Sequence, residues 1–270
     1  MDHAAFLGSD LPSIAAVKSG IIKPGCDVVC AGQPDEVMGV IRLACERSHA
    51  PLHVVKDEDI RLLSCSLDGQ DFTIPFIAAD TAPGSALSLH TSLAGTYQPK
   101  NAALAVLAAL VLKKRGFKNI TVQSIANGVS MARWPGRFEV LRKAPAFVID
   151  GAHNPDGIRA LSESLKQYFP GKKLIMIIGV LADKDYRAML TQILPFAGKF
   201  HTVTVPNPRS LPGEELAAVL NSMGADAVFH DSIADAVKAA LGEAGKEDVI
   251  LAFGSLYYIG YVRSYVLRDI

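Results

Sequence analysis

The run Asp150-Gly-Ala-His-Asn-Pro155 brings together side chains that can do chemistry. A carboxylate, an imidazole and an amide stand between an apolar run at 146–149 and a segment that reads as a helix from Pro155 onward. Asn154 and Pro155 suit the N-cap and first position of that helix, because proline needs no N–H there. This cap leaves Asp150 and His153 unexplained. Ligands of open α/β sheets bind at the carboxyl ends of strands, so this turn is the first candidate site.

The elements that must position this turn follow a regular pattern from about residue 138 onward. Apolar runs typical of buried parallel strands stand at 146–149, 174–179, 200–205, 227–229 and 249–253. Amphipathic spacing predicts helices at 155–169, 186–196, 213–223 and 232–243. Strands alternating with helices imply a Rossmann-like, mostly parallel open sheet with helices on both faces. Residues 255–267 add a final strand, a hairpin or a closing helix.

The first half of the chain is mixed α/β. The pattern predicts helices at 10–18, 34–47, 101–114 and 122–132, and strands at 27–31 and 52–55. Runs at 62–66, 72–76 and 86–93, separated by turn residues, favour antiparallel hairpins. The turn Trp134-Pro135-Gly136 breaks regular structure, so we expect two domains, 1–135 and 136–270.

Composition excludes several classes of protein. Half of the residues are hydrophobic, and 27 Lys and Arg balance 27 Asp and Glu, so no overall charge favours nucleic acid or an anionic membrane. The apolar runs are shorter than a membrane span, and the first residues do not resemble a signal peptide. We therefore expect a cytoplasmic protein with no nucleic-acid or membrane partner.

All four cysteines lie in the first quarter of the chain. A zinc site built from Cys45, His49 and His53 has helical spacing, but no CxxC pair accompanies it. Reduced and mostly buried cysteines are the preferred interpretation. The sequence also contains neither the Gly-x-x-x-x-Gly-Lys-Ser/Thr nor the Gly-x-Gly-x-x-Gly phosphate-binding fingerprint.

Seven short runs, taken in order, resemble the folylpolyglutamate synthase/dihydrofolate synthase family of the Mur ligase superfamily. They are Asp2-His3-x-x-Phe6-Leu7-Gly8, Ile14-Ala15-x-x-Lys18-x-Gly20-Ile21-Ile22-Lys23-Pro24-Gly25, Gly95-x-Tyr97-Gln98-x-x-Asn101-Ala102, Trp134-Pro135-Gly136-Arg137-Phe138-Glu139, Asp150-Gly-Ala-His-Asn-Pro155, Asp183-Lys184-Asp185 and Gly254-Ser255-Leu256-Tyr257. The chain looks like the carboxyl-terminal portion of such an enzyme, without the P-loop region. The resemblance implies that residues 1–135 are a partial central (ATPase) domain and 136–270 the carboxyl-terminal Rossmann-like domain.

The resemblance also implies a reaction. In the family, ATP with Mg²⁺ phosphorylates a carboxylate of dihydropteroate or a folate, and the amine of L-glutamate attacks the acyl phosphate. The full-length parent is then a monomeric ligase with small-molecule substrates. This chain alone is expected to be inactive, because it has no P-loop to cradle the β- and γ-phosphates.

Roles for individual residues follow from the same resemblance. His153 is expected to face the reacting centre, and Lys18 matches the lysine that the family carbamylates. Further matches are nucleotide contacts, a magnesium ligand and candidates for binding glutamate. These are Asn101, Arg137 and Asp150 for the nucleotide, His3 for the metal, and His153, Lys184 and Ser255 for glutamate, with Asp183 and Asp185 beside Lys184.

Each of these residues also has a simpler reading. Asp150 could accept N–H groups of its own turn, Asn101 could cap a helix, and Lys18 could be an ordinary helical lysine. The tyrosines of the last segment (Tyr257, Tyr258, Tyr261 and Tyr265) are expected to serve packing.

Two other functions stay open. One is a non-catalytic, degenerate ligase module that binds an amino acid, a nucleotide or a partner chain. The other is a Mur-type ligase acting on peptidoglycan precursors, which the Asp-Gly-Ala-His-Asn-Pro and Gly-Ser-Leu-Tyr runs disfavour. The sequence leaves undecided whether the parent makes dihydrofolate, polyglutamates or both.

Overall fold

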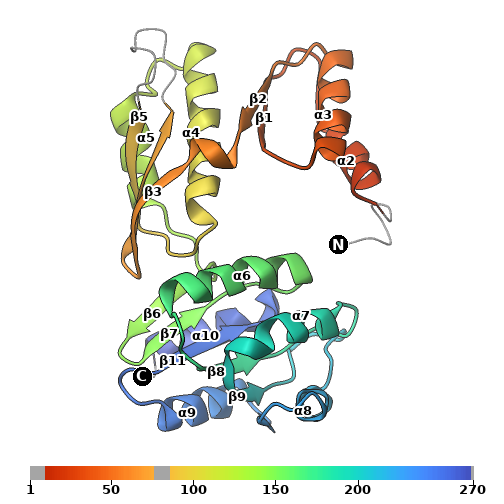
Figure 1. The fold of residues 1–270 in the computed structure, drawn as a ribbon, viewed down its shortest axis with the longest axis vertical. Helices are drawn as coiled ribbons and strands as arrows, with labels where there is room; N and C mark the ends of the chain where they lie inside the picture. The colour runs from red at the N-terminus through yellow and green to blue at the C-terminus, as the bar shows by residue number, and fades with distance from the viewer. Residues whose placement is uncertain (1–9, 76–85, 269–270) are drawn as a thin grey trace. The chain divides into compact units, whose positions relative to one another are not determined.

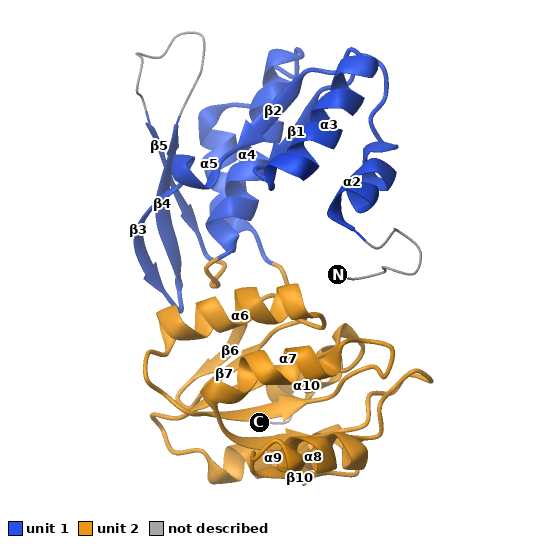
Figure 2. Cartoon of the chain, turned by 45° about the vertical axis from the view of Figure 1, so that its right-hand side comes forward, with its two compact units in different colours: residues 1–92, 97–133 blue, residues 93–96, 134–270 orange. Residues whose placement is uncertain are grey.

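The computed structural model describes residues 10–75 and 86–268, and these fall into two compact units. Unit 1 comprises residues 1–92 and 97–133, and unit 2 comprises 93–96 and 134–270 (Figure 2). The main boundary lies between residues 133 and 134, and Leu93–Thr96, although they come earlier in the chain, also belong to unit 2. There, the Tyr168 hydroxyl accepts the Gly95 N–H at 3.2 Å, and the Ser164 hydroxyl accepts the Thr96 N–H at 3.0 Å.

Unit 2 is built on a six-stranded sheet with the order β10-β9-β8-β11-β7-β6. Its strands are β6 (Glu139–Lys143), β7 (Ala146–Ile149), β8 (Leu174–Ile178), β9 (Ala197–Thr202), β10 (Ala227–Phe229) and β11 (Val249–Phe253). All neighbours pair in parallel except β6 and β7, which are antiparallel. The expected Rossmann-like, mostly parallel sheet is confirmed, with β6 as an additional edge strand.

Helices cover both faces of this sheet (Figure 1). They are α6 (Pro155–Tyr168), α7 (Tyr186–Ile193), α8 (Gly213–Ser222), α9 (Ile233–Glu243) and α10 (Leu256–Arg268), with a short 3₁₀ turn η2 (Leu194–Phe196) after α7. Alternate residues of β7 and β11, such as Phe147 and Ile250, join one buried cluster with α9 and α10. Their neighbours Val148 and Leu251 point to the opposite face and are equally buried. The last segment is therefore the closing helix.

Unit 1 contains two smaller sheets. β1 (Val28–Ala31) and β2 (Leu52–Val55) form a two-stranded parallel sheet, and β3 (Arg61–Ser66), β4 (Gly69–Pro75) and β5 (Ala86–Thr91) form an antiparallel one. The helices are α2 (Leu11–Ser19), α3 (Asp35–Arg47), η1 (Asp57–Asp59, a 3₁₀ turn), α4 (Gln98–Lys114) and α5 (Val122–Met131). The predicted hairpins are thus confirmed. Phe72, Leu89, Val106 and Ile125 from β4, β5, α4 and α5 share one buried core.

None of the helices within residues 10–75 and 86–268 has the length and apolar character needed to cross a membrane.

Candidate active site

The turn after β7 has the geometry that its sequence predicts. Asn154 is the N-cap of α6, and its Oδ1 accepts the Gly157 N–H at 2.7 Å, with Pro155 in the first helical position. Asp150 is only 3% exposed. Its Oδ1 accepts the Ala152 N–H at 2.7 Å and its Oδ2 accepts the Phe138 N–H at 2.8 Å. The carboxylate therefore ties its own turn to the segment that precedes β6.

That segment carries Arg137. Gly136 has φ +74°, a left-handed conformation that glycine adopts without strain, and Phe138 has φ +45° although it is not glycine. Phe138 is held there because its ring is buried, 5.1 Å from the ring of Tyr168, while its N–H is bound by Asp150. The backbone of this turn is therefore fixed at both residues that flank Arg137.

The Arg137 side chain reaches the Asp150 turn. The Gly151 N–H donates to the Gly136 carbonyl at 2.8 Å, which holds the two turns together. A Cβ added to Gly151 would stand 3.0 Å from a terminal nitrogen of Arg137 and would overlap the side chain of Leu256. Arg137, half-exposed, thus lies against the backbone of the turn that holds His153.

An ion pair with the last helix supports the same turn. The Glu139 carboxylate accepts the Gly136 N–H at 2.9 Å and both its oxygens lie within 3.0 Å of the Arg263 Nε. Arg263 belongs to α10, so this ion pair connects the Arg137 turn to the helix that follows Ser255.

The tautomer of His153 follows from one contact. Its Nδ1 lies 2.7 Å from the Gly151 carbonyl oxygen, which can only accept, so Nδ1 carries the proton. In the neutral imidazole Nε2 is then the hydrogen-bond acceptor.

The loops after β8, β9 and β11 form the rest of this edge of the sheet. Asp183 pairs with Arg209 at 2.7 Å, and Asp185 caps α7 by accepting the Ala188 N–H at 3.1 Å. The Ser255 hydroxyl is buried and accepts the Tyr257 N–H at 3.2 Å. Arg209, which sequence reasoning missed, also approaches the Tyr257 hydroxyl at 3.4 Å.

The tyrosine prediction is confirmed for Tyr258 and Tyr265 and wrong for the other two. Tyr258 is fully buried, donates to the Ile177 carbonyl at 2.9 Å, and burial raises the pKa of its phenol. Tyr265 packs against the core of unit 2. Tyr257 and Tyr261 are 51% and 60% exposed, because they lie on the outer face of α10.

Asn101 and Lys18 lie in unit 1, and His3 lies outside the described residues. The prediction that Asn101 is an N-cap is wrong. α4 already begins at Gln98, with Pro99 in its first turn, and the exposed Asn101 donates to the Gln98 side chain at 3.2 Å. Lys18 is an exposed residue near the end of α2.

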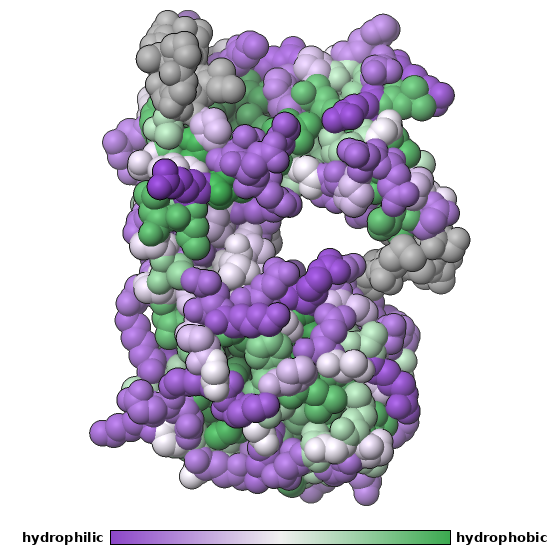
Figure 3. Space-filling view, in the orientation of Figure 1, coloured by the Kyte–Doolittle hydropathy of each residue, from purple (hydrophilic) through white to green (hydrophobic). Residues whose placement is uncertain are grey.

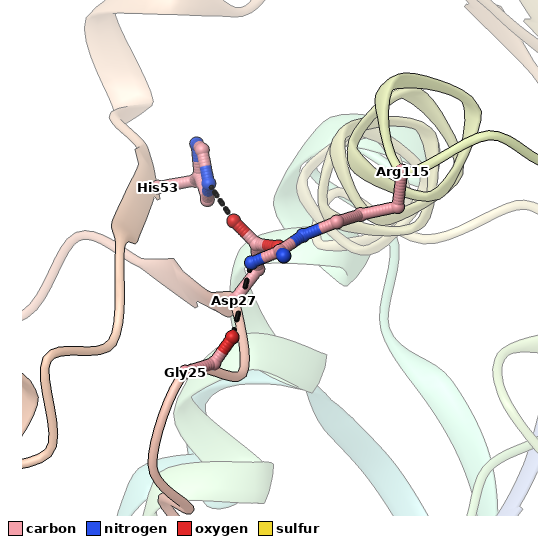
Figure 4. A network of polar contacts seen from close by, with 4 residues as sticks. All are labelled: Gly25, Asp27, His53 and Arg115. Atoms are coloured by element: carbon pink, nitrogen blue, oxygen red, sulfur yellow. Dashed lines mark hydrogen bonds and ion pairs between the residues drawn. The ribbon is translucent and has the colours of Figure 1, made fainter.

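The zinc interpretation of Cys45, His49 and His53 finds no support among the residues that the structure describes, where no three potential ligands could hold a metal ion. His53 instead lies 2.8 Å from the Asp27 carboxylate, which Arg115 also contacts (Figure 4). Hydrogen bonds from His53 and then Arg115 lower the pKa of Asp27.

The cysteines form no disulfide, as expected. The expectation that most are buried is wrong, because only Cys45 is buried, and Cys30 and Cys65 are half-buried. Burial raises the pKa of the Cys30 and Cys45 thiols, which disfavours the reactive thiolate.

Comparison with known proteins assigns most of unit 2 to a described protein family. Residues 136–256 match the family described as "Mur ligase, glutamate ligase domain". Unit 2 therefore carries a domain of the Mur ligase class.

The relatives in sequence are more specific. The chain is 34% identical to a folylpolyglutamate synthase of Lacticaseibacillus casei over 99% of its length, and 32% identical to a dihydrofolate synthase/folylpolyglutamate synthase of Bacillus subtilis over 97%. It spans 60% of the length of each relative. The chain is thus homologous over nearly its whole length to folylpolyglutamate and dihydrofolate synthases, and it corresponds to the carboxyl-terminal portion of these relatives.

Solved structures of folylpolyglutamate synthases are similar to this chain as well. A folylpolyglutamate synthase of Mycobacterium tuberculosis, complexed with ADP and AMPPCP, superposes with a TM-score of 0.83 at 27% identity, covering 100% of this chain and 62% of the other. A mutant of the L. casei synthase gives 0.76 at 30% identity, covering 98% of this chain and 59% of the other.

Proposed function

We propose that this chain is part of an ATP-dependent ligase that adds L-glutamate to dihydropteroate or a folate through an acyl phosphate. The observation that carries the proposal is the fixed position of Arg137 against the turn of Asp150 and His153, within a glutamate ligase domain. The relatives are named for dihydrofolate and folylpolyglutamate synthesis.

The residues of unit 2 fit one side of a nucleotide. Arg137 offers a planar set of N–H donors that matches phosphate oxygens, and its half-exposed position leaves it accessible. Bound ATP would supply the phosphoryl group that activates the substrate carboxylate. Asp150, buried and bound to two N–H groups, contributes by positioning this arginine, and a nucleotide contact by its carboxylate remains a prediction.

His153 fits a role at the attacking amine. With the proton on Nδ1, its Nε2 can accept a hydrogen bond or a proton from the ammonium group of glutamate. Losing that proton makes the amine a nucleophile.

Glutamate brings two carboxylates, which need cationic or hydroxyl partners. Lys184 and Ser255 stay the proposed partners, and Arg209 joins them because it lies at the same edge of the sheet. Its pairing with Asp183 holds the guanidinium in place until a substrate carboxylate competes for it.

The described residues offer less support for a magnesium site than for a nucleotide site. Within the described residues no three His, Cys, Asp or Glu side chains could hold a metal ion, and the proposed ligand His3 lies outside them. No step is therefore assigned to Mg²⁺.

Unit 1 is proposed to be part of the central, ATPase domain, with Asn101 as an adenine contact and Lys18 as a modified lysine. The whole protein is proposed to be a cytoplasmic monomer. The chain by itself is expected to be inactive, since its sequence contains neither phosphate-binding fingerprint.

The test is glutamate-dependent ADP release with dihydropteroate, measured after joining this chain genetically to the amino-terminal part of the L. casei synthase. We expect turnover that requires both substrates and falls by about 100-fold or more in Arg137→Ala, which loses a transition-state contact. Arg159→Ala, at an exposed position of α6, is the matched control and should keep wild-type activity.

Turnover by the chain alone would refute its expected inactivity. A fused protein that binds ATP or glutamate in a thermal-shift assay without releasing ADP would favour the non-catalytic module instead.

A further inference from the structure

The last helix, α10, lies along the turn that carries Arg137. Leu256, Ile259 and Arg263 are spaced three and four residues apart, so they occupy one stripe of this helix. A Cβ added to Gly136 would stand 2.8 Å from the Ile259 side chain, and Leu256 lies against the turn after β7. Successive turns of α10 therefore contact the two turns that meet at Arg137.

The Glu139 carboxylate joins α10 to this turn by three contacts. Its two oxygens lie 2.9 and 3.0 Å from the Arg263 Nε, and one of them also accepts the Gly136 N–H at 2.9 Å. The backbone of Glu139 is already fixed, because it pairs with Ile149 in the sheet. The carboxylate therefore carries the fixed positions of the sheet and of α10 to the residue just before Arg137.

Gly136 is the residue of this turn whose backbone has the most freedom. Glycine has no Cβ, so its φ of +74° competes with many other conformations. On the far side of Arg137, the buried ring of Phe138 and the bond of its N–H to Asp150 hold the backbone. The turn after β7 binds the Gly136 carbonyl, and Glu139 holds the N–H at the other end of the residue. Without Glu139, rotation at Gly136 would displace the Arg137 guanidinium, which stands at the end of a long side chain.

This ion pair differs from the surface pairs of unit 2. Hydrophilic side chains gather over α6 in the space-filling view (Figure 3), and Arg159 and Asp156 of the α6 pair are 68% and 61% exposed. Solvated pairs of that kind have little effect on stability. The Glu139 side chain is only 21% exposed, and its bonds to a guanidinium and a backbone N–H are charge-assisted. Such bonding is suited to fixing a position.

We propose, on the basis of the proposed function, that Glu139 and Arg263 are positioning residues for the ligase reaction. They act through Arg137: their ion pair holds the turn, and the turn places the guanidinium at the phosphate oxygens of ATP. The same helix begins directly after Ser255, a proposed partner of glutamate. One rigid helix thus fixes the distance between the group that binds the nucleotide and a group that binds the amino acid.

The kinetic test compares variants of the fused protein described above. In Glu139→Ala we expect kcat to fall about tenfold, because a stabilising group displaced by about 1 Å can cost up to about 100-fold in rate. The KM for glutamate should change less than about twofold, since Arg137 serves the nucleotide. Arg263→Met removes the cation and should lower kcat in the same way, whereas Arg263→Lys keeps a cation beside Glu139 and should retain most of the activity.

A double-mutant cycle separates positioning from a general structural role. If Glu139 acts through Arg137, adding Glu139→Ala to Arg137→Ala should change kcat by less than about twofold, because the guanidinium is already gone. A further tenfold loss, about the size of the effect in wild type, would show that the carboxylate acts independently of Arg137 and would overturn the proposal. An unchanged kcat in both Glu139→Ala and Arg263→Met would overturn it as well.

Glu243→Ala is the matched control. Glu243 is the last residue of α9 and pairs with Lys199 of β9, and these two side chains are 40% and 28% exposed. The variant therefore removes a partly covered ion pair of the same unit and should keep the wild-type kcat. Circular dichroism of all variants checks that each is folded.

Hydrogen exchange of the present chain tests the same restraint without any turnover. Mass spectrometry of the peptide that covers residues 134–139 should show faster amide exchange in Glu139→Ala than in wild type, and no change in Glu243→Ala. Equal exchange in all three proteins would overturn the proposal. A fused wild-type protein that shows no glutamate-dependent ADP release would refute the proposed function, and faster exchange in Glu139→Ala would then still support the restraint on the Arg137 turn.

Discussion

Replacing Asp150 by asparagine should destabilise unit 2 strongly. The buried carboxylate accepts one N–H on each oxygen, from Ala152 and from Phe138. An amide of the same shape has one accepting oxygen, so one N–H loses its partner and faces an NH₂ group. Losing a charge-assisted hydrogen bond and leaving a buried donor unpaired costs about 2–4 kcal/mol.

Urea unfolding measures this loss directly. The chain has a single tryptophan, Trp134, which belongs to unit 2, so its fluorescence follows that unit. With a denaturant slope of about 2 kcal/mol/M, the midpoint should fall by about 1–2 M in Asp150→Asn. Asp156→Asn is the matched control: its carboxylate is exposed and forms a surface pair with Arg159, so the change should stay below about 0.5 kcal/mol.

The urea midpoints of Asp150→Asn and Asp156→Asn must therefore differ. If Asp150→Asn unfolds at the same urea concentration as Asp156→Asn, the carboxylate does not hold the two turns together, and the positioning role of Asp150 is refuted.

Two further predictions concern other parts of unit 2. Gly151→Ala should cost about 1–3 kcal/mol in the same urea assay and displace Arg137, because the added methyl group overlaps Leu256; unchanged stability would show that this turn has room. His201, buried and 2.8 Å from His230, has its pKa lowered by burial, so the unfolded chain binds its proton more readily than the folded protein. The contribution of His201 to the free energy of unfolding is then fully present above the unfolded pKa of about 6.5 and is lost as the pH drops below it. His201→Gln should therefore flatten the dependence of the unfolding free energy on pH between about pH 7.5 and 5.5. An equal slope in the wild type and the variant would exclude His201 as its source.

The strands and helices of unit 2 were predictable because burial on both faces produces continuous apolar runs. β6 escaped this reasoning for a physical reason. Its sequence Glu-Val-Leu-Arg-Lys carries three charges, since it is an edge strand whose residues are half-buried or exposed. A strand of this kind has no periodic signal of its own and is specified by its pairing with β7.

The start of α4 could not be predicted from the sequence for a different reason. Helix propensity pointed to the alanine-rich run and to Asn101 as its cap, but the helix begins at Gln98, which is buried with Pro99. Tertiary burial of these two residues, which the sequence does not display, extends the helix by one turn.

The part of the site that lies within one short stretch of sequence was predictable, and the part that the fold brings together was not. His153 and Asp150 stand out because they lie together on one turn. Arg209 does not, because its partner Asp183 is 26 residues away and becomes a neighbour only through the adjacent strands β8 and β9. The contact of Glu139 with Arg263 spans 124 residues and is equally hidden in the sequence.

The four residues Leu93–Thr96 affect how the gene could be divided. A cut before Trp134 would release a polypeptide that contains every strand of the six-stranded sheet but lacks these four residues. The Tyr168 and Ser164 hydroxyls would then lose the Gly95 and Thr96 amides that they bind. Unit 2 is therefore not one continuous stretch of sequence. A gene segment that encodes the complete unit must include residues 93–96 as well as residues 134–270.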